Sequence, residues 1–296
     1  MKHFFRRHQR RGSYDLFSSY SHYLPGARGM MMMLVLFLIG AVLGNVVIVG
    51  LKAILGQGFA DNYGSLVSYP VMFIPPLLYA SVRSRLNEYS TPEIPLDRGG
   101  FGAKGWVLLI STGTFSTIAA AYIVEPAAAL LPQMPARLEE TMKRMIENMP
   151  VWATLLSVSV FAPLFEEWLC RGLILRGLLH SLNPFSAIAV SAAFFAVLHM
   201  NPWQAVPAFC LGLLFGYAYY STGSLKLTML MHCANNTAAV ILGRIPQFKE
   251  AETFMDVLNP WAYWSIYAAC ILIVISALVL LRNFRHAQGN LSFRHP

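Results

Sequence analysis

The sequence predicts an all-α protein, a polytopic bundle of about eight transmembrane helices. Hydrophobic residues make up 56% of the chain and charged residues only 12%, about half the charged share of ordinary soluble domains. The mean hydropathy is +0.52. Apolar stretches long enough to cross a bilayer recur along the chain, and the first, residues 30–51, contains no charge. We therefore expect the lipid bilayer to cover most of the protein surface.

The apolar stretches divide the chain into eight expected spans. The first two are long and are separated by a short polar turn, and the third begins after a loop rich in Pro and Gly. The fifth is short and the seventh is polar for a lone span, so neighbouring helices are expected to shield both. In chain order, the spans cover residues 30–54, 64–82, 105–124, 151–178, 186–199, 204–221, 225–243 and 260–281.

A different pattern occupies the segment between the third and fourth spans. Its apolar residues recur at helical spacing with charged residues between them, which is typical of an amphipathic helix on a membrane surface. These apolar residues are Leu138, Met142, Met145, Ile146 and Met149.

Charge at the ends of the spans predicts the topology. The chain reads as a basic tail (1–29), one membrane-embedded domain (30–282) and a second tail (283–296). Basic residues beside the outer spans mark the cytoplasmic side, and eight spans return the chain to the side where it began. Both termini are therefore expected in the cytoplasm, and the short loops favour a bacterial inner membrane. Because the net charge of +8 is placed beside the spans, no nucleic-acid partner is expected.

Ionisable side chains inside the spans are the first pointer to a site. A charge at mid-bilayer costs about 2.5–3.5 kcal/mol on insertion scales, so each needs a partner and a bundle interior. Those that stand out are Glu166, Glu167, Arg171, His199 and His232.

The acidic pair of the fourth span predicts two different roles. Glu167 and Arg171 are four residues apart and share a helix face, so they are expected to form an ion pair. Glu166 points about 100° away around the helix and lacks that partner. A buried carboxylate without a cation suits a general base. Pro163, one turn earlier, is expected to kink the helix and open backbone groups beside the site.

Two further pairs share a helix face, Phe195 with His199 and His232 with Asn236. From the helical rise, His232 lies about 10 Å, His199 about 20 Å and Glu166 roughly 15–20 Å from the cytoplasmic ends. All three side chains are therefore expected to lie in one pocket. Such a pocket suits water activation, either directly by carboxylate and imidazole or through a divalent metal such as zinc held by Glu166, His199 and His232. The sequence leaves both routes open.

These residues resemble the motifs of the CPBP family, the CAAX proteases and bacteriocin-processing membrane proteins also grouped as Abi proteins. Its members include the eukaryotic Ras-converting CAAX endopeptidase and the lysostaphin resistance protein A-like bacterial proteins. The family patterns EExxxR, FxxxH and HxxxN occur here as residues 166–171, 195–199 and 232–236, in the family's order and each on an apolar stretch.

The resemblance implies an intramembrane endopeptidase with a catalytic core at about residues 150–243, which cleaves a membrane-associated protein or peptide. It implies that Glu166 is the general base, that His199 helps to bind the water or metal, and that His232 and Asn236 complete the site or stabilise the oxyanion. Supporting roles are implied for Glu167, Arg171 and Phe195.

Three other functions compete with this interpretation. A transporter or channel would string polar residues through the whole membrane, whereas here they gather at one depth. A haem protein with His199 and His232 as axial ligands would leave Glu166 unexplained. A catalytically inactive scaffold or immunity protein would keep the pocket for binding alone.

Overall fold

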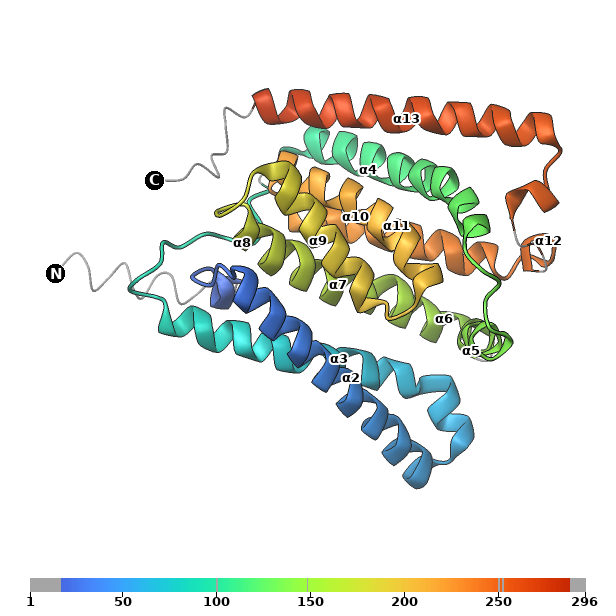
Figure 1. Ribbon diagram of the computed structural model, residues 1–296, viewed down its shortest axis with the longest axis horizontal. Helices are drawn as coiled ribbons and strands as arrows, with labels where there is room; N and C mark the ends of the chain where they lie inside the picture. The colour runs from blue at the N-terminus through green and yellow to red at the C-terminus, as the bar shows by residue number, and fades with distance from the viewer. Residues whose placement is uncertain (1–16, 100, 148, 250, 252, 288–296) are drawn as a thin grey trace.

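The structure is a computed structural model that describes residues 17–99, 101–147, 149–249, 251 and 253–287. In these ranges every regular element is helical, which confirms the all-α prediction. Figure 1 shows the long helices running across one view as a layered bundle. The predicted tails fall partly on residues 1–16 and 288–296, outside the described residues. The division into tails and membrane domain stays a prediction.

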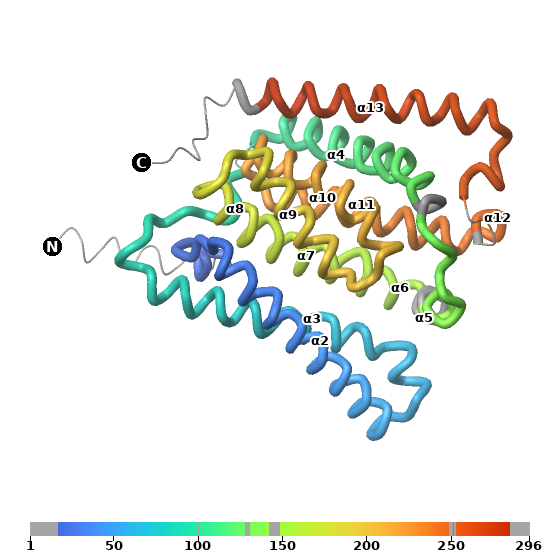
Figure 2. Tube along the Cα trace, in the orientation of Figure 1, coloured from blue at the N-terminus to red at the C-terminus, as the bar shows by residue number. Residues whose placement is uncertain are grey.

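The first two long helices form a hairpin along one side of the bundle (Figures 1 and 2). A short turn at residue 56 joins α2 (Ala27–Leu55) to α3 (Gln57–Leu86). Their backbones approach closely, because a Cβ at Gly40 would collide with the backbone carbonyl of Met72. Small residues allow such contacts between helices in lipid, where van der Waals packing drives association.

The opposite side of the bundle is formed by α4 (Ala103–Val124) and the last long helix, α13 (Pro260–Ala287), which lie side by side. Tyrosines tie the two together, since Tyr122 donates to the carbonyl of Tyr263 and Tyr267 donates to that of Ile123. The start of α2 and the end of α13 lie at the same end of the bundle (Figure 1).

The predicted amphipathic segment forms α5 (Ala136–Glu147), which follows a 3₁₀ turn, η2 (Glu125–Leu130). Figure 1 views this helix nearly end-on at the right-hand end of the bundle, whereas the long helices run across the picture. That orientation suits a helix lying along a membrane surface. Side chains 142–147 are outside the description, although Met149 beyond them is buried.

The fourth span is one continuous rod, residues 151–178, whose winding changes along its length. It consists of α6 (Val151–Thr154), a π-helical η3 (Leu155–Phe161), α7 (Ala162–Glu167), a second π-helical η4 (Trp168–Leu175) and α8 (Arg176–Leu178). Single π-turns inside α-helices are rare and occur often at functional sites. Here two of them flank the segment that carries the acidic pair.

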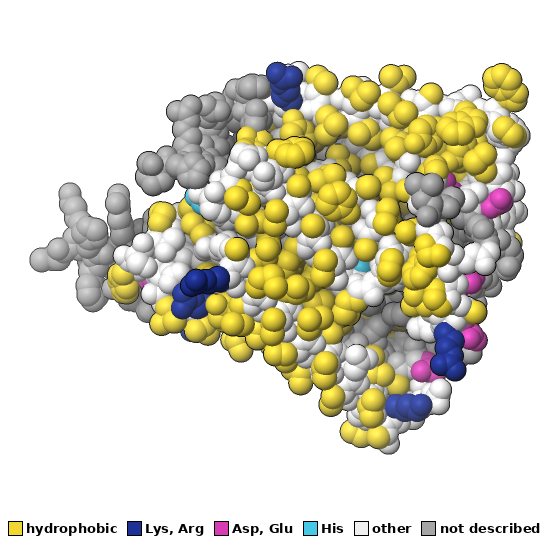
Figure 3. Space-filling view, viewed as in Figure 1, with side chains coloured by type: hydrophobic (Ala, Val, Ile, Leu, Met, Phe, Trp, Pro, Cys, Tyr) yellow, Lys and Arg dark blue, Asp and Glu magenta, His cyan; other side chains and the backbone are white. Residues whose placement is uncertain are grey.

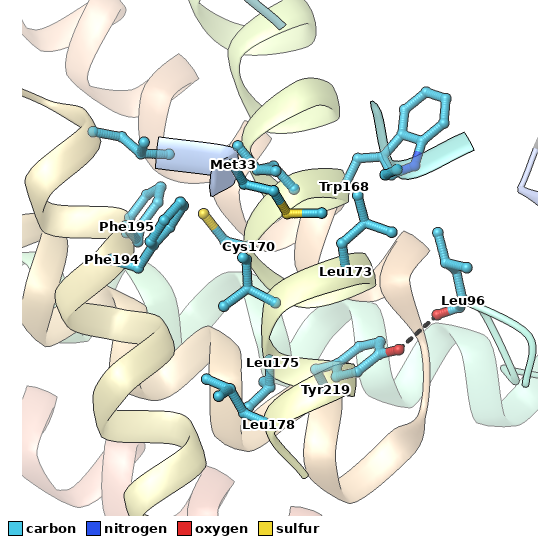
Figure 4. Close-up of a cluster of buried hydrophobic side chains, with 14 of the residues drawn as sticks. Met33, Leu96, Trp168, Cys170, Leu173, Leu175, Leu178, Phe194, Phe195 and Tyr219 are labelled. Carbon is cyan, nitrogen blue, oxygen red and sulfur yellow. Dashed lines mark hydrogen bonds between the residues drawn. The ribbon is translucent and has the colours of Figure 1, made fainter. Parts of the chain in front are cut away.

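Three helices surround this rod, namely α9 (Pro184–Leu198), α10 (Pro202–Thr222) and α11 (Leu225–Leu242). Each starts with a side-chain cap, from Asn183, Asn201 and Ser224 respectively, which satisfies an orphan backbone donor. Two short elements, α12 (Pro246–Lys249) and η5 (Phe254–Asp256), lead on to α13. The main core lies around η4 (Figure 4), whose fully buried Leu173 and Leu175 belong to one cluster with Phe194 of α9.

The structure does not confirm the count of eight spans. In the described part of the chain, five helices are long and apolar enough to cross a membrane, at residues 27–55, 57–86, 103–127, 151–178 and 260–284, and α9 is apolar but shorter. All eight expected segments are helical, but α9–α11 are short or polar and pack around the central rod. Hydrophobic side chains cover the middle of the visible face in Figure 3, and charged ones lie towards the helix ends. The protein is an integral, multi-pass membrane protein.

Candidate active site

The acidic pair lies in the middle of the bundle rather than at its lipid-facing surface. Glu166 and Glu167 end α7, and both residues are buried, with relative exposures of 8% and 0% for the whole residue. The rod places them between the hairpin on one side and α9–α11 on the other. A buried carboxylate requires compensation, so the neighbours of each oxygen define the site.

Glu167 forms the predicted ion pair with Arg171. The Arg171 Nη1 to Glu167 Oε1 distance is 2.8 Å, and both side chains are fully buried. Arg171 also donates to the carbonyl of Gly212 over 3.0 Å and lies 4.5 Å from the centroid of the Phe195 ring. A Cβ at Gly212 would lie only 3.3 Å from the guanidinium, so glycine gives the cation access to this carbonyl.

His232 from α11 bridges the two acids. Its Nδ1 is 3.1 Å from Glu167 Oε1, and its Nε2 is 3.7 Å from Glu166 Oε2. The contact with Glu167 assigns the Nδ1 proton to that hydrogen bond, so Nε2 is the nitrogen that faces Glu166. The ring stacks on Phe215 with centroids 5.4 Å apart and meets the edge of Phe195. These contacts fix the plane of the imidazole.

The two oxygens of Glu166 have different surroundings. Oε1 accepts a hydrogen bond from the hydroxyl of Tyr69 in α3. Oε2 is buried, faces His232 and accepts no hydrogen bond within the described residues. Glu167 Oε2 is also unpaired there, but Arg171 neutralises its carboxylate. Glu166 therefore presents one oxygen that is free for a further ligand.

Tyr69 was missed by the sequence interpretation, which expected Glu166 to have no fixed partner. The tyrosine lies in the second span, far from the acidic motif in the chain, and one hydroxyl in an apolar helix shows no periodicity. A polar aromatic residue in the middle of a span was the available signal.

Within the described residues, His199 contacts Phe195 rather than the acids. It caps the end of α9, is half-buried, and its Nδ1 is 2.9 Å from the carbonyl of Phe195. The Phe195 ring lies between the two histidines, with its centroid 4.9 Å from that of His199 and 5.4 Å from that of His232. In the described residues, His199 thus contacts the Phe195 ring, and the Phe195 ring in turn contacts His232.

Asn236 lies on the same side of α11 as His232 but contacts a different part of the rod. Its Nδ2 donates to the carbonyl of Val158 in η3 over 2.8 Å. The preceding π-type hydrogen bond runs from the amide of Ala162 to Ser157, so the next donor in register for Val158 would be residue 163. Because residue 163 is proline, it has no N–H, and Asn236 supplies the missing bond. The second N–H of this amide remains available.

The structure does not test the predicted metal site, since it contains no ligand or metal. Among the described residues, no group of three or more His, Cys, Asp or Glu side chains is positioned to hold a metal ion. Glu166 and His232 are neighbours, but Phe195 separates them from His199. The metal role stays a prediction, and no catalytic step is derived through it.

Residues 148–238 match the family model described as "Type II CAAX prenyl endopeptidase Rce1-like". The chain contains an Rce1-like domain. The match includes α7, η4, α9, α10 and most of α11, and so all of the predicted motif residues. Comparisons with curated proteins and with solved structures each gave no match.

The Rce1-like domain confirms the resemblance to the CPBP family of CAAX-type intramembrane proteases. It supports an intramembrane endopeptidase in general. It does not extend to Tyr69, because α3 lies outside the matched residues. The geometry around Glu166 therefore carries information that the family match does not.

Proposed function

We propose that the protein is an intramembrane endopeptidase that hydrolyses a peptide bond of a membrane-associated protein or peptide, with Glu166 as general base. The observation that carries the proposal is the unpaired, buried Glu166 Oε2 beside His232 Nε2. A carboxylate and an imidazole at this spacing offer two polar atoms to one reacting water. The Rce1-like match over the same residues supports the same chemistry.

In the proposed reaction, Glu166 Oε2 removes a proton from the bound water as the water oxygen bonds to the peptide carbonyl carbon. The carbonyl oxygen becomes an oxyanion. Glu166 then returns the proton to the peptide nitrogen, and the C–N bond breaks to give a carboxylic acid and an amine. Glu167, paired with Arg171, accepts a hydrogen bond from His232 Nδ1 and so orients the imidazole throughout.

Three further side chains are proposed to bind the substrate carbonyl. A protonated His232 has an Nε2–H that can donate to the oxyanion, and Asn236 has one N–H left after its bond to Val158. Preorganised donors of this kind stabilise developing charge. His199, whose Nδ1 is engaged by Phe195, has Nε2 left to bind the water or the substrate.

The location and the substrate complete the proposal. A bacterial inner membrane with both termini in the cytoplasm is supported by the basic tails and by the position of the ends of α2 and α13 at one end of the bundle. The matched family description names CAAX prenyl endopeptidases, so a prenylated CAAX peptide and its unprenylated counterpart are the first substrates to compare.

A comparison of membrane proteomes tests the proposal without a known substrate. Membranes from cells that express the wild type are compared with those that express Glu166→Ala, and new peptide termini are counted. Cleavage products are expected only with the wild type. Glu88→Ala, at an exposed site after α3, serves as the control and should match the wild type. Identical termini in all three membranes would contradict the proposal.

A further inference from the structure

We propose that Tyr69 is a positioning residue that fixes the orientation of the Glu166 carboxylate and leaves Oε2 as its reactive oxygen. The catalytic role of Tyr69 rests on the proposed function, whereas the hydrogen bond to Glu166 does not depend on it. The Tyr69 hydroxyl donates to Glu166 Oε1, and Oε2 faces His232. The phenol and the imidazole thus reach the carboxylate from α3 and α11, on two sides of the rod.

The position of the phenol is fixed by aromatic packing. The Tyr69 ring lies against Phe73, one turn along α3, with centroids 5.5 Å apart. Phe73 in turn stacks on Phe165 at 5.5 Å and 18°, and Phe165 is the residue before the base. One continuous aromatic stack therefore connects the hydroxyl donor to the backbone that carries Glu166. Such packing restricts rotation of the donor before substrate binds.

The carboxylate needs this restraint because its terminal torsion is broad and roughly two-fold. Without a donor on one oxygen, the two oxygens exchange places easily, and neither is dedicated to water. A hydrogen bond to an ionised carboxylate is about twice as strong as one between neutral groups. Tyr69 thereby favours one orientation of the carboxylate, in which Oε2 faces His232.

The inference also changes which part of the chain belongs to the site. Tyr69 lies in α3, whereas the Rce1-like match begins at residue 148. The α2–α3 hairpin thus supplies part of the environment of the base and is more than a membrane anchor. The segment that matches the family would lack this donor on its own.

The test uses the full chain, purified in detergent, and compares Tyr69→Phe with Tyr63→Phe. Both changes remove one hydroxyl from α3 and keep the ring. Tyr63 stacks on Trp152, two turns from Tyr69, and so serves as the matched control. Infrared difference spectra follow the Glu166 carboxyl band, which is assigned by its loss in Glu166→Gln.

In Tyr69→Phe this band is expected to shift in frequency, because the Glu166 carboxyl loses the hydrogen bond on Oε1. In Tyr63→Phe it should stay at the wild-type frequency. A purely structural role of the tyrosine would lower stability without moving the band.

Activity provides the second readout, with a farnesylated CAAX peptide and its unprenylated form as probes. Turnover by Tyr69→Phe is expected to fall roughly tenfold with KM unchanged, because the base loses the hydrogen bond that orients it. An unchanged band in Tyr69→Phe would overturn the inference. If the band shifts while Glu166→Gln cleaves normally, the positioning contact stands and the proposed function fails.

Discussion

At the scale of single residues, the sequence predicted the acidic pair correctly and its surroundings only in part. The spacing of Glu167 and Arg171 was sufficient because helix geometry alone brings residues four apart together. The bridge from His232 to both acids, and the donor Tyr69, depend on which helices become neighbours. No local pattern contains that information. The sequence interpretation also passed over Arg176, a fully buried cation near the end of the rod, because its partners too come from distant segments.

The buried ion pair gives a prediction at this scale. Arg171→Ala should lower the free energy of unfolding by about 3–5 kcal/mol, because it removes one partner of a fully buried ion pair. Activity should fall with it, since His232 loses a fixed partner. The exposed Lys226 pairs with Asp97 at 3.2 Å, so Lys226→Ala is the matched control and should cost at most about 1 kcal/mol. Unfolding of both variants in detergent checks this, and equal losses would contradict the ion-pair account.

At the scale of the elements, the sequence predicted the fourth span and a disturbance of its backbone at Pro163. It did not predict the change between α-helical and π-helical winding. We expected Pro163 to open backbone groups, and the structure contains an α-segment between two π-helical ones. Apolar periodicity does not separate a π-turn from an α-turn over so few residues. The carbonyl of Val158 shows how the winding is stabilised, because a side chain from another helix satisfies it.

This arrangement predicts non-additive effects of Pro163 and Asn236. Asn236→Ala should destabilise the protein by about 1–3 kcal/mol, the cost of an unpaired buried carbonyl. In a Pro163→Ala background residue 163 regains its N–H, so the same asparagine change should cost clearly less. A double-mutant cycle of unfolding measures the difference. Purely additive effects would show that Asn236 does not replace the backbone hydrogen bond that Pro163 cannot donate to the carbonyl of Val158.

At the scale of the whole molecule, composition predicted the membrane and the helical class, but the number of spans was not confirmed. The length of an apolar stretch identifies helices that face lipid. The positions of α9, α10 and α11 depend instead on their packing around the rod. Arg176 joins segments that lie far apart in the sequence. It donates to the carbonyls of Tyr20, Ser21 and Tyr23 and to that of Ile94. One cation thus binds the segment before α2 and the loop after α3 to the rod.

Replacing this cation should release both segments together. In Arg176→Met the amides of Tyr23 and Ile94, which form backbone bonds to Tyr20 and Ser21, should exchange with deuterium faster than in the wild type. The reason is that four carbonyls lose the hydrogen bond from the guanidinium at once. Hydrogen–deuterium exchange with Arg85→Met as control, at an exposed arginine near the end of α3, provides the check. Unchanged exchange at both amides would mean that packing alone holds these segments.

The central claim is that Glu166 acts as the base, and the kinetics of Glu166→Gln test it most directly. The glutamine keeps the size of the side chain and an acceptor for Tyr69, but it cannot take a proton from water. With the farnesylated and unprenylated CAAX peptides as substrates, turnover by the purified variant is predicted to fall by at least about 100-fold, with the same unfolding midpoint as the wild type. Wild-type turnover by a correctly folded Glu166→Gln would contradict the account.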